Sequence, residues 1–361
     1  MILHRYIGSE SLKTTAAVTT TLLLIVLSSR FVRYLAEISK GDLSADSLFL
    51  LILLRIPNFL ELLLPLGFFI GLLLAFGRLY TDSEVTVMNA CGLGPVSLLK
   101  FSGLPIAVIS LITASLSLYI TPKSLNQYEA LIKENKRATY SAVGGKFRLD
   151  PSSGRTTFIE EYSPDNMEMT GVFTSRPVRL DNGRILYTVI NAERGKLGQD
   201  AASGEQYLLL DSGYRVVGEP GSLDFQIARF SHYGQYIEDN PVNRLRNIKD
   251  GLDSIDLYRS DNPEHHAALQ WRISLAFIVP IASIMAIGLS RTSPRSGRYA
   301  KLLPAILLYM AYLVMLNSAH AYAMEGNISL GIQGIWYVHA LHFLIACTIL
   351  FWPDMTRRLS R

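Results

Sequence analysis

Six apolar stretches, divided into two groups by a polar middle region, constrain this sequence more than any other feature. Each has about 20 or more mostly apolar residues, enough for a helix to cross the roughly 30 Å hydrocarbon layer of a membrane. Only 18% of all residues are charged, against roughly 25% in ordinary soluble domains, so a soluble globular protein is disfavoured. The sequence predicts a helical membrane protein with six spans, at residues 14–36, 48–77, 95–120, 267–290, 301–322 and 333–352.

The first two stretches carry details beyond their hydropathy. The first follows Arg5, Glu10 and Lys13 and lacks a small-residue cleavage pattern, so we interpret it as a retained span and not as a signal peptide. The second, if wholly helical, is about 45 Å long and exceeds the hydrocarbon layer. It contains Pro57 and Pro65. Since proline removes a backbone donor, we expect this helix to be tilted, bent or partly outside the bilayer.

Basic residues between and after the later spans predict the orientation. Arg291, Arg295, Arg298 and Lys301 crowd the loop between the fourth and fifth spans, and the chain ends with three arginines in its last five residues. The loop between the fifth and sixth spans has only Glu325. The positive-inside rule therefore predicts that both termini and the loops 78–94 and 291–301 are cytoplasmic, with residues 122–266 on the outer side.

The polar middle region, residues 122–266, has its own composition. It carries 18 basic and 21 acidic side chains, a net charge of −3, whereas the flanks are at +7. A mildly acidic region argues against nucleic acid as a partner. The two cysteines, Cys91 and Cys347, both lie elsewhere, so neither a disulfide framework nor a cysteine zinc site holds this region together.

Short β-type segments follow one another through this region. They are rich in Val, Ile, Tyr, Phe and Thr, and are separated by the turn sequences Asp-Asn-Gly, Arg-Gly-Lys, Asp-Ser-Gly and Glu-Pro-Gly-Ser. This spacing predicts an inserted all-β domain, a sandwich or jelly roll, after a helical stalk at 122–140. The segments are 156–160, 171–174, 184–191, 206–210, 214–217 and 223–230, and the polar run 238–266 returns to the membrane.

No sequence motif indicates catalysis. The nucleotide-binding pattern GxxxxGK[ST] is absent, so any ATP hydrolysis belongs to a partner. The hydrolase and zinc-protease patterns GxSxG and HExxH are absent as well. His339 and His342 are three apart on the sixth span and have the ligand type for a metal, but no third ligand completes a site, and packing is the favoured interpretation. His265 and His266 are interpreted as a solvated loop end. We expect no cofactor and no metal.

Charged residues inside the spans carry more information. Arg30 and Arg33 share a helix face near the outer end of the first span. They either extend to the outer headgroups or form a cationic clamp for an anionic amphiphile, since guanidinium pairs bidentately with phosphate. Arg55 and Glu61 are six apart in the second span, not on one face, and we expect each to pair with another helix or subunit.

The loop 78–94, RLYTDSEVTVMNACGLG, predicts a short amphipathic helix at about 80–92, closed by Gly92 and Gly94. A short helix between two spans suits a groove on a soluble partner. Asp82 and Glu84 favour a basic protein surface over anionic lipid, and Val87 and Met88 supply apolar contact.

Segment 77–93, GRLYTDSEVTVMNACGL, resembles the cytoplasmic coupling segment of the LptF/LptG permease family, the membrane subunits of the lipopolysaccharide exporter. Residues 4–7, 271–275 and 294–298 agree with the same family, and the resemblance covers essentially the whole chain. The N-terminal residues, Arg30/Arg33 and residues 90–92 resemble the LptF branch more than the LptG branch.

The resemblance implies a non-catalytic permease subunit of the inner membrane of a Gram-negative bacterium, with residues 122–266 in the periplasm. Its implied partners are an LptG-like permease half, a dimeric LptB-like ATPase, a single-span LptC-like protein, a periplasmic LptA-like jelly-roll bridge and lipopolysaccharide. By the same resemblance, Glu84 docks on the ATPase, and Arg30 and Arg33 face lipopolysaccharide phosphates. The implied domains are 1–121, 122–266 and 267–361.

Three other classes of function stay open at this stage. One is a lipoprotein-release or efflux-type ABC permease, although those usually have four spans and a large domain after the first. Another is a membrane-bound enzyme with its catalytic domain at 122–266, for which Glu160, Asp224 and His232 are scattered candidates. The last is a structural anchor, which would not explain arginines inside a span.

Overall fold

The computed structural model describes residues 2–39, 43–142, 145–149, 154–163, 168–179, 183–199, 206–236, 251–291, 301–324 and 328–359. The chain divides into two compact units. The helical unit comprises Met1–Arg33, Phe49–Glu129 and Asn247–Arg361, and the second comprises Tyr34–Leu48 and Ala130–Arg246.

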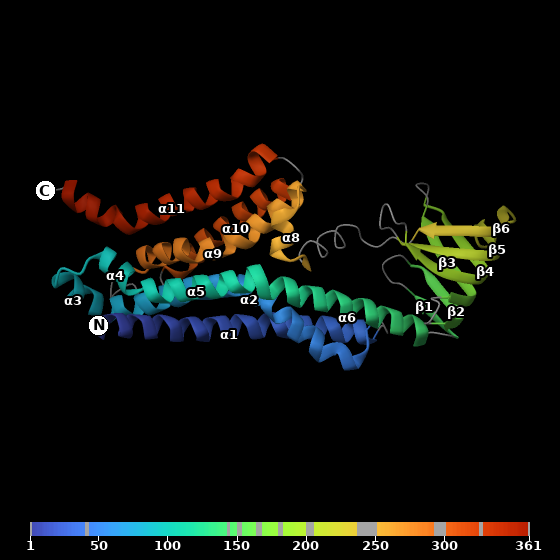
Figure 1. Ribbon diagram of the computed structural model, residues 1–361, viewed down its shortest axis with the longest axis horizontal. Helices are drawn as coiled ribbons and strands as arrows, with labels where there is room; N and C mark the ends of the chain where they lie inside the picture. The colour runs from blue at the N-terminus through green and yellow to red at the C-terminus, as the bar shows by residue number, and fades with distance from the viewer. Residues whose placement is uncertain are drawn as a thin grey trace. The chain divides into compact units, whose positions relative to one another are not determined.

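Within the described residues, six helical segments are long and apolar enough to cross a membrane, as the sequence predicted. The loop residues 292–300, on which the predicted orientation partly rests, lie outside the described residues, as do 325–327 and 360–361, so the orientation stays a prediction. The spans are formed by α1 (Ile2–Ser39), η1 (Ala45–Ser47) with α2 (Leu48–Thr81), α5 (Gly103–Ser115) with the segments that continue it, α9 (Pro263–Leu289), α10 (Leu302–Met324) and α11 (Ile328–Leu359) (Figure 1).

The third span begins later than the sequence predicted. Residues Pro95–Phe101 form a separate short helix, α4, and the span itself starts with α5 at Gly103. The expected start at 95 was wrong because apolar composition alone does not reveal the break at Ser102. The span continues through a π-helical turn, η2 (Leu116–Ile120), into α6 (Thr121–Ala142), which contains the expected helical stalk.

Helices α1 and α2 meet along a strip of small residues. Gly67 and Gly71 of α2 lie one turn apart against Thr19 and Thr15 of α1, and a Cβ on Gly71 would come within 2.8 Å of the Thr15 backbone. Thr15, Thr19 and Ser11 are buried on this face of α1. This is the close helix approach that glycines four residues apart permit in membranes, where van der Waals contact between backbones replaces the hydrophobic effect.

Helix α9 has the most fully buried apolar window of the described candidate spans. In its most apolar 18-residue window 67% of residues are buried, the highest share among the described candidate spans. It packs against α5, α10 and α11. The ring of Phe69 on α2 stacks on Tyr309 of α10, with centroids 5.0 Å apart, which joins the first half of the chain to the second.

The second unit contains a single antiparallel sheet of six strands in which every strand pairs with its neighbour in the sequence. The inserted β domain is thus confirmed. The strand order is a meander, so a two-sheet sandwich or a Greek-key jelly roll is not the connectivity of the described strands. The strands are β1 (Lys146–Leu149), β2 (Thr156–Ser163), β3 (Glu168–Arg179), β4 (Ile185–Gln199), β5 (Gln206–Gly218) and β6 (Phe225–Tyr236).

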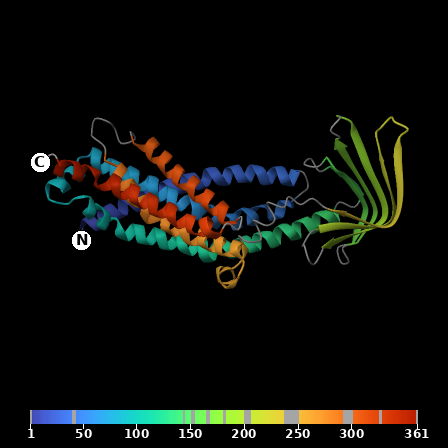
Figure 2. The same cartoon turned by 90° about the horizontal axis from the view of Figure 1, so that it is seen from above.

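One row of residues interrupts the pairing of five strands without changing their register. On each of β2 to β6 the pairing skips one residue of the row formed by Glu160, Gly171, Glu193, Ser212 and Ser231. Gly171 and Ser212 have positive φ angles, 59° and 52°. Buried residues on the two sides of the row are three apart and not two, as with Ile159 and Tyr162. The strands therefore bend together at this row, and Figure 2 shows their curvature.

The bend explains two turns that were predicted wrongly. Arg194-Gly195-Lys196 lies inside β4 directly after the row residue Glu193, and Asp211-Ser212-Gly213 lies inside β5 centred on the row residue Ser212, so the segments 206–210 and 214–217 form one strand. Ser212 adopts a positive φ of 52° at the bend, whereas Gly195 lies where a Cβ would come within 3.1 Å of the Leu210 and Val172 side chains, and neither sequence reverses the chain. The Glu-Pro-Gly-Ser turn is real, since Ser222 N–H donates to the Glu219 carbonyl at 3.1 Å and Gly221 has φ 85°.

Candidate functional site: the coupling segment and the arginines of the first span

A short helix, α3 (Glu84–Ala90), lies between the second and third spans, as the sequence predicted. Its end is fixed by Gly92, which has φ 84°. The Gly92 and Leu93 amides donate to the carbonyls of Asn89 and Met88, each at 3.0 Å. This pair of bonds is a Schellman motif, for which glycine is the preferred residue.

The predicted contact residues on and beside α3 differ in how far they are buried. Val85 is fully buried and Met88 is 7% exposed, and both belong to the core of the helical unit. Val87 is 62% exposed, Glu84 is half-buried and Asp82 is exposed. Met88 therefore anchors α3 to its own chain, and Val87 and Asp82 are left on the outside with part of Glu84.

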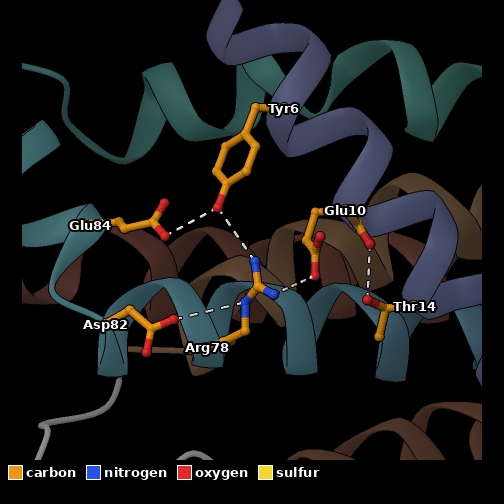
Figure 3. A network of polar contacts seen from close by, with 6 residues as sticks. All are labelled: Tyr6, Glu10, Thr14, Arg78, Asp82 and Glu84. Carbon is orange, nitrogen blue, oxygen red and sulfur yellow. Dashed lines mark hydrogen bonds and ion pairs between the residues drawn. The ribbon is translucent and has the colours of Figure 1, made fainter.

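Glu84 is held by a polar network that sequence reasoning missed (Figure 3). The hydroxyl of Tyr6 on α1 donates to Glu84 Oε1 at 3.1 Å and accepts from Arg78 Nη2 at 3.4 Å. Arg78, at the end of α2, also pairs with Glu10 Oε1 of α1 at 3.1 Å, and its Nε lies 3.9 Å from Asp82 Oδ2. The only sequence signal for this network was that residues 4–7 and 77–93 both carry the family resemblance.

Arg30 and Arg33 lie on α1 but have different surroundings. Arg30 is half-buried, and its Cζ lies 5.4 Å from the centroid of the Phe59 ring on α2. Arg33 is exposed and has no ion pair with another described residue. The aromatic contact orients Arg30 while leaving its N–H groups for another acceptor, whereas Arg33 is open to whatever surrounds the helix.

Arg55 contacts another helix, as the sequence predicted, and it is also linked to Glu61 within α2, which spacing did not predict. Arg55 Nη1 donates to Asn58 Oδ1 at 3.4 Å, and Asn58 Nδ2 donates to Glu61 Oε1 at 3.3 Å, all on α2. Spacing had placed the two charges on different faces, but Asn58 bridges them by two steps of three residues. Glu61 is 7% exposed, and Arg55 also lies over the ring of Tyr128 on α6 at 4.3 Å.

A buried arginine ties the returning chain to the third span. Arg272 on α9 is 6% exposed and donates from Nη1 to Ser254 Oγ at 2.8 Å. Ser254 begins α8 (Ser254–Arg259) and donates to the Leu118 carbonyl of η2 at 2.6 Å. A π-helical turn displaces backbone carbonyls from the regular ladder, which accounts for one being available here.

The two intramembrane histidines take part in packing and hydrogen bonding. His339 Nδ1 and the Tyr312 hydroxyl are 2.5 Å apart, and His342 stacks on the Tyr312 ring with centroids 4.2 Å apart. Both histidines are buried, with exposures of 4% and 2%. His265 and His266 lie in the first turn of α9, not in a loop.

The residues considered for an enzymatic domain are not brought together. Glu160 is on β2 and His232 on β6, four strands apart, which is roughly 19 Å at the usual strand spacing. His232 pairs with Asp211 at 2.7 Å on an exposed surface. The backbone N–H of Asp224 donates to Ser222 Oγ at 3.1 Å in the turn before β6. The described residues of the sheet therefore offer no catalytic constellation from this set.

Comparison with known proteins identifies the family of the chain. The chain matches the family described as lipopolysaccharide export system permease LptF/LptG over residues 5–353. It is 32% identical over 364 aligned residues to the lipopolysaccharide export system permease protein LptF of Escherichia coli K12, covering 100% of this chain and 98% of the relative. The LptF proteins of Escherichia coli O157:H7 and Shigella flexneri are similar to the same extent.

Proposed function

Since the chain belongs to the LptF/LptG family of lipopolysaccharide export permeases, we propose that it is the LptF-type permease subunit of such an exporter. It is a multi-pass protein of the inner membrane and does not itself hydrolyse ATP. Its task is to extract lipopolysaccharide from the outer leaflet of the inner membrane and pass it towards the outer membrane. The full-length relatedness and the six candidate spans support this function.

The proposed partners follow from the same family. The subunit pairs with an LptG-like permease half on a dimeric LptB-like ATPase, associates with an LptC-like single-span protein, and delivers lipid to an LptA-like periplasmic bridge. In the proposed orientation both termini and α3 are cytoplasmic, and the β domain is periplasmic. Basic residues are concentrated in the loops that this orientation places in the cytoplasm, as the positive-inside rule requires, and this supports the orientation.

One observation carries the proposed coupling to ATP hydrolysis. Helix α3 is anchored by buried Val85 and Met88, so movement of α3 must be felt by the core of the helical unit. Its outer side presents Val87 beside the half-buried carboxylate of Glu84. An apolar side chain next to an acidic group suits a groove with a basic rim on the ATPase.

Arg30 and Arg33 are the proposed contacts for lipopolysaccharide phosphates. The position of Arg30 over Phe59 supports this role because the ring holds the guanidinium without using its hydrogen-bond donors. Arg33, exposed on the same helix, can approach the same headgroup. Together they form a cationic pair three residues apart, which fits an anionic headgroup.

The coupling assignment is tested by Glu84→Arg in the assembled complex. Charge reversal turns attraction to a basic surface into repulsion, so the complex should bind the ATPase at least about tenfold more weakly, about 1.4 kcal/mol, with normal membrane insertion. Thr86→Arg is the matched control, since it adds the same cation to an exposed position of α3 about 200° around the helix from Glu84. Unchanged ATPase binding and transport in Glu84→Arg would refute the assignment.

A further inference from the structure

The hydroxyl of Tyr6 joins three separate elements. It is on α1, accepts from Arg78 at the end of α2, and donates to Glu84 at the start of α3. Among the described residues, Tyr6 is the only side chain that hydrogen-bonds to a side chain of α3. Within the described part of the chain, this side-chain connection to α3 therefore passes through a single phenol oxygen.

Arg78 strengthens the connection to α1 by contacting two of its residues. Its Nη2 contacts Tyr6 and its Nη1 contacts Glu10, one helical turn further along α1. A guanidinium presents several donors in a fixed plane and reaches both groups at once, whereas a lysine ammonium lacks this planar fork. Exposed ion pairs of this kind contribute little to stability, and the side chains of Arg78 and Glu10 are 37% and 23% exposed. Their effect is to orient groups, not to hold the fold together.

We propose that Tyr6, with Arg78 and Glu10, forms a latch that positions the Glu84 carboxylate and transmits movement of α3 to α1. Residues from Tyr6 to Arg30 belong to one helix without proline, about 36 Å long. A displacement at the end of α1 that carries Tyr6 is thereby transmitted along the helix to Arg30, which lies over the Phe59 ring. The latch rests on the proposed function, because α3 must be moved by an ATPase for the latch to act.

One buried atom indicates that the latch has a second arrangement. Arg78 Nε is buried and has no hydrogen-bond partner among the described residues. Asp82 Oδ2 lies 3.9 Å away, just beyond hydrogen-bond distance, and Asp82 is in the turn that leads to α3. A shift of this turn by about 1 Å towards Arg78 would complete the bond. Movement of α3 and tightening of the Arg78 contacts are therefore linked by geometry.

The latch is tested with Tyr6→Phe in the complete complex, reconstituted in proteoliposomes that contain lipopolysaccharide. This substitution removes only the hydroxyl. Lipid transported per ATP hydrolysed should fall three- to tenfold while the amount of associated ATPase stays at the wild-type level. Arg78→Lys should give the same loss, because it keeps the charge and loses the fork. The matched control is Tyr337→Phe, which removes a bond of the same 3.1 Å length, to Gln333, within a single helix and should leave the ratio unchanged.

The outcomes separate the latch from the proposed function. If Tyr6→Phe has the wild-type transport ratio while Glu84→Arg loses the ATPase, the latch is wrong and the coupling assignment stands. If Glu84→Arg is also neutral, the coupling assignment itself is wrong. Loss of associated ATPase in Tyr6→Phe would make Tyr6 part of the docking surface and overturn the positioning role. In the supporting case, Tyr6→Phe combined with Glu84→Gln lowers the ratio no further than the more severe single variant.

Discussion

The contact between α1 and α2 gives a quantitative prediction at Gly71. In Gly71→Ala the new Cβ would lie 2.6 Å from Thr15 Oγ1 and 2.8 Å from both Thr15 Cα and N. Carbon atoms in good contact are about 3.5–4.0 Å apart, so α1 has to retreat by about 1 Å. The obstructing atoms include backbone, so rotation of one side chain does not relieve the contact.

The expected magnitude combines two opposing effects. Overpacking of this kind costs about 1–3 kcal/mol. Alanine is favoured over glycine inside a helix by roughly 0.5–1 kcal/mol, which offsets part of that cost. The expected net loss is about 1–2 kcal/mol. Gly67→Ala should lose less, because its closest contact is the hydroxyl of Thr19, which can rotate, and the Thr19 Cα is 3.2 Å away.

The assay is the free energy of unfolding of the purified protein in mixed detergent micelles. Gly103→Ala is the control, since a Cβ at Gly103 would meet nothing within 4 Å, and it should lose no stability. The predicted order of stability is Gly103→Ala, then Gly67→Ala, then Gly71→Ala. A Gly71→Ala protein as stable as the wild type, or a Gly103→Ala protein as unstable as Gly71→Ala, would contradict the close-packing argument.

Three further predictions concern other parts of the chain. Replacing both Arg30 and Arg33 by glutamate should reduce crosslinking of lipopolysaccharide about tenfold or more while assembly with the ATPase stays intact. Replacing both by lysine should be tolerated only if the pair merely reaches lipid headgroups. Normal lipid extraction by the double glutamate variant would refute the proposed phosphate contact. Gly171→Ala should destabilise the β domain by about 1–2 kcal/mol or more in a thermal unfolding measurement, because φ is 59° and a Cβ would lie 2.6 Å from Glu160 Cβ. Gly183→Ala, also at positive φ but with open space, should lose less stability in that measurement. In a cysteine-free background, Leu223→Cys, at a position that is 96% exposed, should react with a membrane-impermeant maleimide from the periplasmic side; labelling from the cytoplasm alone would reverse the proposed orientation.

The spans and α3 could be predicted from the sequence because local composition decides them. A helix long and apolar enough to cross a bilayer is specified by about 20 consecutive residues, whatever they pack against. Likewise, the glycine that closes α3 acts through its own backbone angle, and Gly92 appears in the sequence at the required place. The inserted β domain could also be predicted, since its short apolar segments and intervening turn sequences are local signals.

Which of those turn sequences reverse the chain depended on neighbouring strands. Arg194-Gly195-Lys196 lies within β4 because β3 and β5 pair on either side of it, and the bend occurs where all five strands skip a pair in the same row. A single strand does not reveal such a row. The row is visible only across several paired strands, so only the assembled sheet distinguishes a bend from a reversal.

The surroundings of the candidate site residues were likewise decided by tertiary packing. Spacing placed Arg55 and Glu61 on different faces, yet Asn58 links them, and apolar character did not distinguish buried Met88 from exposed Val87. Local composition was enough to predict six candidate spans, the short helix α3 and the β insert. The contact of Tyr6 with Glu84 was visible only in the packed structure, because it joins residues 78 apart on different helices.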